Sequence, residues 1–109
     1  MAFDVKLAER VRKLVAGAHR FDEKRMFGGL AFMVNGHMCC GVLKDDLVLR
    51  VGPQEHEKLK HHPHARPMDF TGRPLRGFLY VGPAGLRSAR DLRVWVQRSL
   101  QFVDSLPPK

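Results

Sequence analysis

The chain has 109 residues, 44% of them hydrophobic and 28% charged, which is ordinary for one globular domain with a modest core. No stretch approaches the roughly 18–20 apolar residues of a membrane span, and the charged N-terminus lacks the apolar centre of a signal peptide, so we expect a cytoplasmic protein without membrane contact. Lys and Arg number 19 against 11 Asp and Glu, and the formal net charge of +8 favours phosphate polymers or acidic protein surfaces as partners.

An amphipathic helix is predicted over residues 3–18, because apolar side chains recur there every three or four positions. The polar segment 19–24 is predicted to be a connector. Three strands of an antiparallel meander are predicted next, over residues 26–34, 37–43 and 47–51. Asn35-Gly36 predicts a two-residue hairpin turn between the first two strands, since both central positions of that turn need a positive φ.

The meander contains two unusual residue pairs. Gly28-Gly29 predicts a bulge or a close backbone approach. Cys39 and Cys40 are expected to point to opposite faces of one strand, so they neither form an unstrained disulfide nor bind one metal ion together. They are interpreted as reduced, small, partly buried side chains of a reducing compartment. The alternative is a nucleophilic Cys39 paired with His37, two residues away.

A short surface helix is predicted over residues 53–60, with Pro53 in its first turn and Leu59 as its main buried anchor. A loop, an extended segment, a turn and a strand are predicted to follow, over residues 61–67, 68–70, 71–74 and 75–81. The final helix is predicted over 89–105, with Ser88 as its N-cap and Asp91 in the capping-box position. Its apolar stripe consists of Leu92, Trp95, Val96, Leu100 and Val103.

This element order predicts an α+β fold for residues 1–109 as a single domain: an antiparallel sheet of about 4–5 strands, packed with an N-terminal and a C-terminal helix plus one short helix. We expect the helices to cover one sheet face. The other face would carry Met33, Phe78, Tyr80 and one of the two cysteines. Such an apolar face predicts self-association as a homodimer.

The segment Arg25-Met26-Phe27-Gly28-Gly29, followed by an apolar strand, NG, a second strand with small residues and LVLRVG, resembles the N-terminal domain of the TfoX/Sxy competence regulators. GRPLRGFLYV and the helix with Trp95 are similar to that family too, so that the resemblance covers about residues 5–104. It implies an α+β domain with a curved antiparallel sheet and a partnership with a transcription activator of DNA-uptake genes. Those regulators carry a second, C-terminal domain. The 109 residues show no match to it, so we expect a stand-alone member of the family. The resemblance implies no catalytic residues.

Motifs of enzymes and cofactor sites are not found in the sequence. It contains no GxxxxGK[ST], no GxGxxG after a strand and no GxSxG, so we expect no enzyme activity and no cofactor. His61, His62 and His64 cluster in one predicted loop. We interpret this cluster as a solvated polar loop, with weak binding of a divalent metal as the alternative.

Arginines are the better candidates for a binding site. Between residues 66 and 98 seven arginines are opposed only by Asp69 and Asp91. A row of arginines on one helix face can follow a phosphate backbone or meet an acidic protein. The candidate phosphate- or partner-binding residues are Arg73, Arg76, Arg87, Arg90 and Arg93.

Three functions are compatible with these residues. The first is a non-enzymatic regulatory or adaptor domain that acts through protein contacts, with a transcription regulator as partner and nucleic acid nearby. The second is direct, weakly specific binding of nucleic acid by the basic surface. The third is a small-ligand or metal-binding protein that uses Gly28-Gly29 and the histidine-rich loop.

Overall fold

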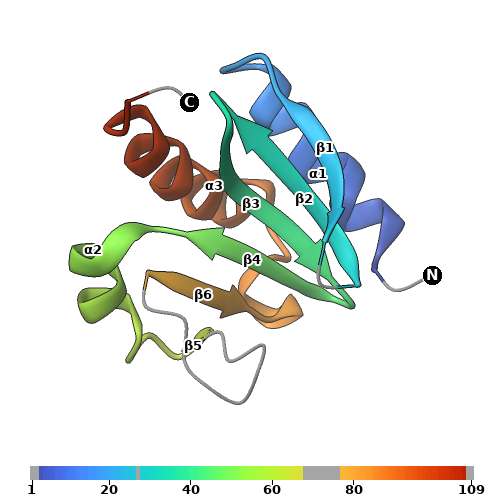
Figure 1. The fold of residues 1–109 in the computed structure, drawn as a ribbon. Coiled ribbons are helices and arrows are strands. Elements are labelled where there is room, and N and C mark those ends of the chain that lie inside the picture. The colour runs from blue at the N-terminus through green and yellow to red at the C-terminus, as the bar shows by residue number, and fades with distance from the viewer. Residues whose placement is uncertain (1–2, 27, 68–76, 108–109) are drawn as a thin grey trace.

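The computed structural model describes residues 3–26, 28–67 and 77–107. Within them, three α-helices and a short 3-10 helix accompany one six-stranded antiparallel sheet (Figure 1). The helices are α1 (Val5–Ala16), α2 (Gly52–Leu59), η1 (Pro83–Gly85) and α3 (Ala89–Asp104). The strands are β1 (Asp22–Met26), β2 (Gly29–Val34), β3 (His37–Leu43), β4 (Asp46–Arg50), β5 (Ala65–Pro67) and β6 (Phe78–Val81). They are arranged in the order β1-β2-β3-β4-β6-β5.

The predicted α+β class is confirmed, and the strand count is slightly higher than predicted. Segment 19–24 was predicted to be a connector, which is wrong for its second half, because Asp22 to Met26 pair with Met33 to Gly29 as β1. The loop predicted over 61–67 likewise ends in β5, which pairs with β6. Both are edge strands, and edge strands tolerate charged residues and proline. Because β1 is charged and β5 contains a proline, neither has the apolar pattern by which a strand is predicted from sequence. The segments predicted over 68–70 and 71–74 lie outside the described residues.

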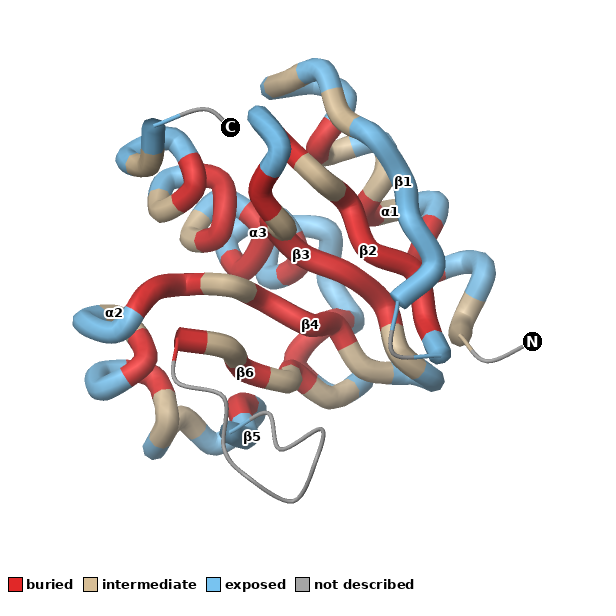
Figure 2. The backbone as a smooth tube through the Cα atoms, in the orientation of Figure 1, coloured by how far each residue is buried: buried red, intermediate tan, exposed pale blue. Residues whose placement is uncertain are grey.

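Helices α1 and α3 pack on one face of the sheet, α1 against β2 and β3 and α3 against β3 and β4 (Figure 1). The core lies between these two layers. Four residues in register across the central strands form one of its rows: Phe32, Cys40, Leu49 and Leu79. Figure 2 shows the central strands as mostly buried and β1 as exposed along its length. The main hydrophobic cluster therefore lies between the helices and one face of the sheet, an arrangement that antiparallel sheets commonly adopt.

Local signals fix the starts of the helices, close to the prediction for α2 and α3, whereas α1 is shorter at both ends than the predicted 3–18. Ser88 caps α3, and its Oγ accepts the backbone N–H of Asp91 at 3.0 Å. Pro53 stands in the first turn of α2 and Leu59 is buried, both as predicted, and His56 is buried beside it. Asp4 is an N-cap that was not predicted, and its carboxylate accepts backbone N–H groups from the first turn of α1. These caps satisfy the free donors of the first helical turns.

The predicted close approach at the glycine pair is confirmed, but its place in the chain differs. The strand predicted over 26–34 is the end of β1, a turn, and β2. Gly28, with φ 77°, lies in that turn. A Cβ on Gly29 would lie 2.2 Å from the carbonyl oxygen of Val42, so only glycine lets β2 and β3 approach here. Asn35 and Gly36, with φ of 55° and 82°, form the predicted hairpin turn.

The expectation that Cys39 and Cys40 point to opposite faces is wrong. The pairing of β2 with β3 passes from Phe32 opposite Cys40 to Met33 opposite Met38, so Cys39 is the extra residue of a β-bulge. A bulge interrupts the alternation of side chains, and both thiols are free, fully buried members of the core. A hydrogen bond with Cys39, together with burial, raises the pKa of Cys40 well above that of an ordinary thiol.

The outer face of the sheet is less open than predicted. Ala31 and Val48 are completely buried there, although no described helix packs on them as α1 and α3 pack on the core face. Phe78 and Tyr80 are half-buried on the same face, as is Met33. Among the large apolar side chains described on this face, Met26 alone is exposed, at 38%. No second chain is present, so the homodimer stays a prediction.

Candidate functional site

Three of the five predicted arginines lie at the start of α3. Arg87, Arg90 and Arg93 are all exposed. Arg90 and Arg93 are one turn apart on the solvent side of the helix. Arg87 precedes the N-cap and therefore does not belong to the helical row that the spacing predicted. We call these three residues the α3 arginines. Arg73 and Arg76, the other predicted site residues, lie outside the described residues.

The segment before α3 is fixed to α1. The guanidinium of Arg10 donates a hydrogen bond from Nη2 to the carbonyl oxygen of Leu86, at 2.8 Å. Leu86 itself is buried. This bond orders the backbone next to Arg87, and it brings a second cation, Arg10, close to the start of α3. The inner side of α3 is anchored by Trp95, which is only 4% exposed. The α3 arginines thus stand on a rigid support.

Acidic side chains elsewhere are engaged with other basic groups. Glu23 pairs with Arg12, Asp46 with Arg66, and Asp104 with His19. In contrast, no ion pair within the described part of the chain involves the α3 arginines. They also stand at the positive end of the helix dipole, where cations are not favoured by the helix itself. The start of α3 is therefore a concentrated positive surface that can attract anionic groups.

A hollow of about 570 Å³ lies beside α3, on the flank where Trp95 meets the histidine-rich loop. The rings of His62 and Trp95 form a T-shaped contact, with their centroids 4.9 Å apart. The guanidinium of Arg98 stacks on the indole ring of Trp95, 4.7 Å from the ring centroid. The hollow is lined by His62, Pro63, His64, Gly85, Arg90, Asp91, Val94, Trp95 and Arg98.

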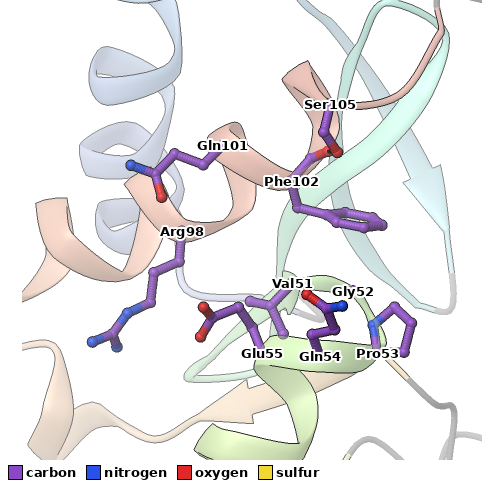
Figure 3. A pocket seen from close by; sticks show the side chains of 9 residues that line it. All are labelled: Val51, Gly52, Pro53, Gln54, Glu55, Arg98, Gln101, Phe102 and Ser105. Carbon is purple, nitrogen blue, oxygen red and sulfur yellow. Dashed lines mark hydrogen bonds between the residues drawn. The ribbon is translucent and has the colours of Figure 1, made fainter.

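A second hollow, of about 590 Å³, continues along α3 toward its C-terminal end (Figure 3). Arg98 lines both hollows, so we treat them as one feature and name it the α3 groove. Figure 3 shows Arg98 and Glu55 at one end of the second hollow and the ring of Phe102 above Pro53 at the other. The second hollow is lined by Val51, Gly52, Pro53, Gln54, Glu55, Arg98, Gln101, Phe102 and Ser105.

Gly52 allows Phe102 to pack at the edge of the second hollow. Its φ is 82°, and a Cβ at this position would lie 2.3 Å from the ring of Phe102. The ring therefore packs directly on the backbone at the start of α2. Phe102 lies outside the apolar stripe that was predicted for the helix. Its i, i+4 spacing to Arg98 on a helix was the one available signal that both residues share a flank.

The histidine-rich loop contributes to the groove through contacts of its rings. The backbone N–H of His64 donates to Nδ1 of His62 at 3.1 Å, so the neutral imidazole of His62 carries its proton on Nε2. His61 is exposed and does not line the groove. Across the described ranges, no three His, Cys, Asp or Glu side chains are grouped so that they could hold a metal ion. Metal binding by this loop stays an untested alternative.

The alternative of a Cys39 nucleophile finds no supporting contact. Nε2 of His37, the proposed base, is 2.6 Å from the carbonyl oxygen of Pro107 and is engaged there. The thiol of Cys39 has no exposed surface. The pKa of its neighbour Cys40 is raised, and thiols of that kind are poor nucleophiles because the thiolate is the reactive form.

Comparison with models of protein families matches residues 13–103 to the TfoX N-terminal domain. The chain belongs to the TfoX N-terminal domain family. The match covers most of the 109 residues, and it confirms the resemblance seen in the sequence. It includes the α3 arginines and nearly all of the α3 groove. No curated protein and no solved structure matches the chain. None of the helices described for this TfoX N-terminal domain is long and apolar enough to cross a membrane.

Proposed function

We propose that this TfoX N-terminal domain is a non-enzymatic regulatory or adaptor domain that binds an acidic surface of a partner protein in a transcription context. One observation carries the proposal: the α3 arginines are exposed, and they have no acidic partner among the described residues. They stand on a helix whose other side is held in the core by Trp95. A preformed cationic surface of this kind can bind an acidic partner without the entropic cost of ordering the helix first.

Family membership supports the regulatory part of the proposal. The resemblance to competence regulators implies a partnership with a transcription activator, and the match over residues 13–103 includes the helix that carries the arginines. An enzymatic role has less support: in the described part of the chain no contact joins either thiol to a basic side chain, and Cys40 has a raised pKa. Binding, rather than chemistry, is the activity that we assign to the exposed arginines.

Direct binding of nucleic acid is the second candidate, and the same arginines favour it. Guanidinium groups pair with phosphate as well as with carboxylate, and the net charge of +8 attracts any polyanion. Contacts of this sort would be weakly specific, since phosphates carry no sequence information. The two candidates differ in the partner and not in the protein surface, so one set of variants can test both.

The test uses two charge-reversal variants that carry the same change in charge. In the first, the α3 arginines Arg87, Arg90 and Arg93 are changed to Glu. The matched control changes Arg20, Lys24 and Lys44, which are exposed and lie on other elements. Fluorescence anisotropy of a labelled duplex and a labelled single strand is measured at about 50 and 200 mM salt. Retention of a transcription regulator from cell extract is measured with the same three proteins.

The proposal predicts that the α3 variant loses the retained regulator and that the control keeps it. Binding of nucleic acid should then be weak, and both variants should reduce it equally, because it depends only on net charge. Tight binding that falls steeply with salt and is lost only in the α3 variant would instead establish the second candidate. Retention of the regulator by the α3 variant would contradict the adaptor proposal at this surface.

The homodimer belongs to the same proposal. Its support is the outer face of the sheet, where Met33, Phe78 and Tyr80 are half-buried and Met26 is exposed. Two copies that meet on this face would cover the partly exposed apolar side chains. Light scattering at high protein concentration tests it directly. A mass of 12.4 kDa, that of one chain, would rule out the homodimer.

A further inference from the structure

We propose that the α3 groove binds an extended peptide segment of the partner protein, with acidic side chains at the Arg90 end and an apolar side chain at the Phe102 end. This inference rests on the proposed function, since it names the chemistry of the segment that an adaptor would hold. It concerns a different flank of α3 from the solvent side where Arg93 stands. The argument comes from the charges, contacts and dimensions of the two hollows.

The first hollow is basic. Two guanidinium groups line it, those of Arg90 and Arg98, together with the imidazoles of His62 and His64. Among the described residues, Asp91 is the one acid in its lining, so guanidinium groups outnumber carboxylates there. Arg98 is half-buried and stacked on Trp95, so its guanidinium is held in place before any ligand arrives. A guanidinium fixed in this way can donate paired hydrogen bonds to a carboxylate at a low entropic cost.

The second hollow has a different character. Phe102, Val51 and Pro53 give it an apolar wall, and Gln101 and Ser105 add groups that can bond to a peptide backbone. Its cation is Arg98, at the junction with the first hollow, and Glu55 is near that junction (Figure 3). An apolar side chain in the hollow can pack against Phe102 and Pro53, which both line it. The groove therefore changes from basic to apolar along its length.

This change of character favours a peptide over a nucleic-acid strand. A strand has a negative phosphate at every nucleotide, so a strand that followed the groove would bring phosphates to Glu55 and to the ring of Phe102. A peptide can instead alternate its chemistry and place carboxylates and an apolar side chain where each is matched. Electrostatic complementarity of this kind selects partners by penalising the wrong charge.

The length of the groove sets the length of the segment. Helix α3 has 16 residues, and the two hollows follow it from Arg90 to Ser105. At 1.5 Å per residue the helix is roughly 24 Å long. An extended chain advances about 3.3 Å per residue, so about seven residues span the groove. Heptapeptides are thus the right probe.

The experiment selects random heptapeptides, displayed on phage, on the immobilised full chain. Two variants are used in parallel, one for each half of the groove. Arg98→Gln removes the central cation, and Pro53→Asp places a carboxylate beside the ring of Phe102. Arg20→Gln is the matched control, because Arg20 is an exposed arginine away from the groove. The most enriched peptide is then synthesised, labelled and titrated by anisotropy with each protein.

The expected result is enrichment of peptides with two or more acidic residues next to an apolar one. Arg98→Gln should raise the Kd of the selected peptide about tenfold, the scale of one lost charged hydrogen bond, and should remove the acidic preference. Pro53→Asp should remove the apolar preference, and Arg20→Gln should change neither. Trp95 is the sole tryptophan of the chain, so a change in its fluorescence on binding would report contact with the groove itself.

Three results would overturn the inference: no enrichment, peptides without acidic residues, or a Kd that Arg98→Gln leaves within about twofold. An eight-nucleotide single strand that displaces the peptide and depends on Arg98 would reassign the groove to nucleic acid. Thermal melts followed by circular dichroism verify that each variant is folded. Changing only Arg87 and Arg93 to Glu separates the two proposals. Loss of the regulator in this variant with the peptide Kd unchanged places the partner on Arg87 and Arg93 and contradicts the groove as its binding site. Retention of the regulator by this variant, together with its loss in Arg98→Gln, places the partner in the groove.

Discussion

The β1–β3 region, which carries the family motif, and the outer side of α3 differ in what their residues do. In the first, Gly29 is glycine because a Cβ would collide with the carbonyl oxygen of Val42, and Gly41 because a Cβ would lie 2.5 Å from that of Leu30. In the second, the exposed arginines satisfy no packing requirement. The glycines of the β1–β3 region are therefore explained by the close approach of neighbouring strands, and they need no functional explanation. The exposed arginines at the start of α3 lie outside that glycine motif.

The largest effect is expected on the inner side of α3. Trp95→Ala should lower the free energy of unfolding by about 3–5 kcal/mol, because it removes a buried aromatic side chain that packs between His62 and Arg98. Urea denaturation measures it. The matched control is Val94→Ala, one residue away and 39% exposed, which should change stability by less than about 0.5 kcal/mol. A loss below about 1 kcal/mol for Trp95→Ala would mean that α3 does not hold its arginines on a rigid support.

The next effect tests the motif region. Gly29→Ala should cost about 1–3 kcal/mol, because β2 and β3 must separate to admit the methyl group between their backbones. Chemical denaturation again gives the value. Gly17→Ala is the control: its Cβ would make ordinary contacts of 3.5 Å and longer at a right-handed helix end, and it should stabilise by about 0.4–1 kcal/mol. If both substitutions behaved alike, the motif would have to be explained by function and not by packing.

Elements with strong local signals were predictable from the sequence. Asn35-Gly36, the Ser88 cap and the apolar periodicity of the two long helices each determine local structure by themselves, and each prediction is confirmed. The edge strand β1 was not predictable, because its residues are all exposed and it exists only through its pairing with β2. The bulge at Cys39 was hidden for a related reason, since the register depends on both strands.

The candidate site was predictable only in part. The excess of arginine pointed to the start of α3, and Arg90 and Arg93 do lie on one side of that helix. The groove could not be foreseen, because it joins Arg98 and Phe102 to Pro53 and His62, which are distant in the sequence. Tertiary packing brings these segments together. The spacing of residues along the sequence does not show which side of a helix a distant loop will contact.

The smallest effect is expected in the motif region, at the ion pair that links β1 to α1. The guanidinium of Arg12 holds two oxygens of Glu23, at 2.5 and 2.8 Å, and this hydrogen bonding lowers the pKa of Glu23 in the folded state. A carboxylate with a depressed folded pKa stabilises the protein above its unfolded pKa of about 4.3, and the contribution disappears as pH falls through the folded value. Glu23→Gln should therefore cost less than about 1 kcal/mol at neutral pH, since the pair is partly exposed to solvent.

The difference between the wild type and Glu23→Gln should narrow below about pH 4.3 and close once Glu23 is protonated in the folded protein. Thermal unfolding across acidic pH measures it. Asp22→Asn is the control, since Asp22 is the adjacent exposed acid of β1 and forms no ion pair within the described ranges. A difference that persisted undiminished at low pH would mean that Glu23 acts through packing. The difference between the two regions would then be larger, because even a charged side chain of the β1–β3 region would act in packing, whereas the exposed arginines of α3 do not.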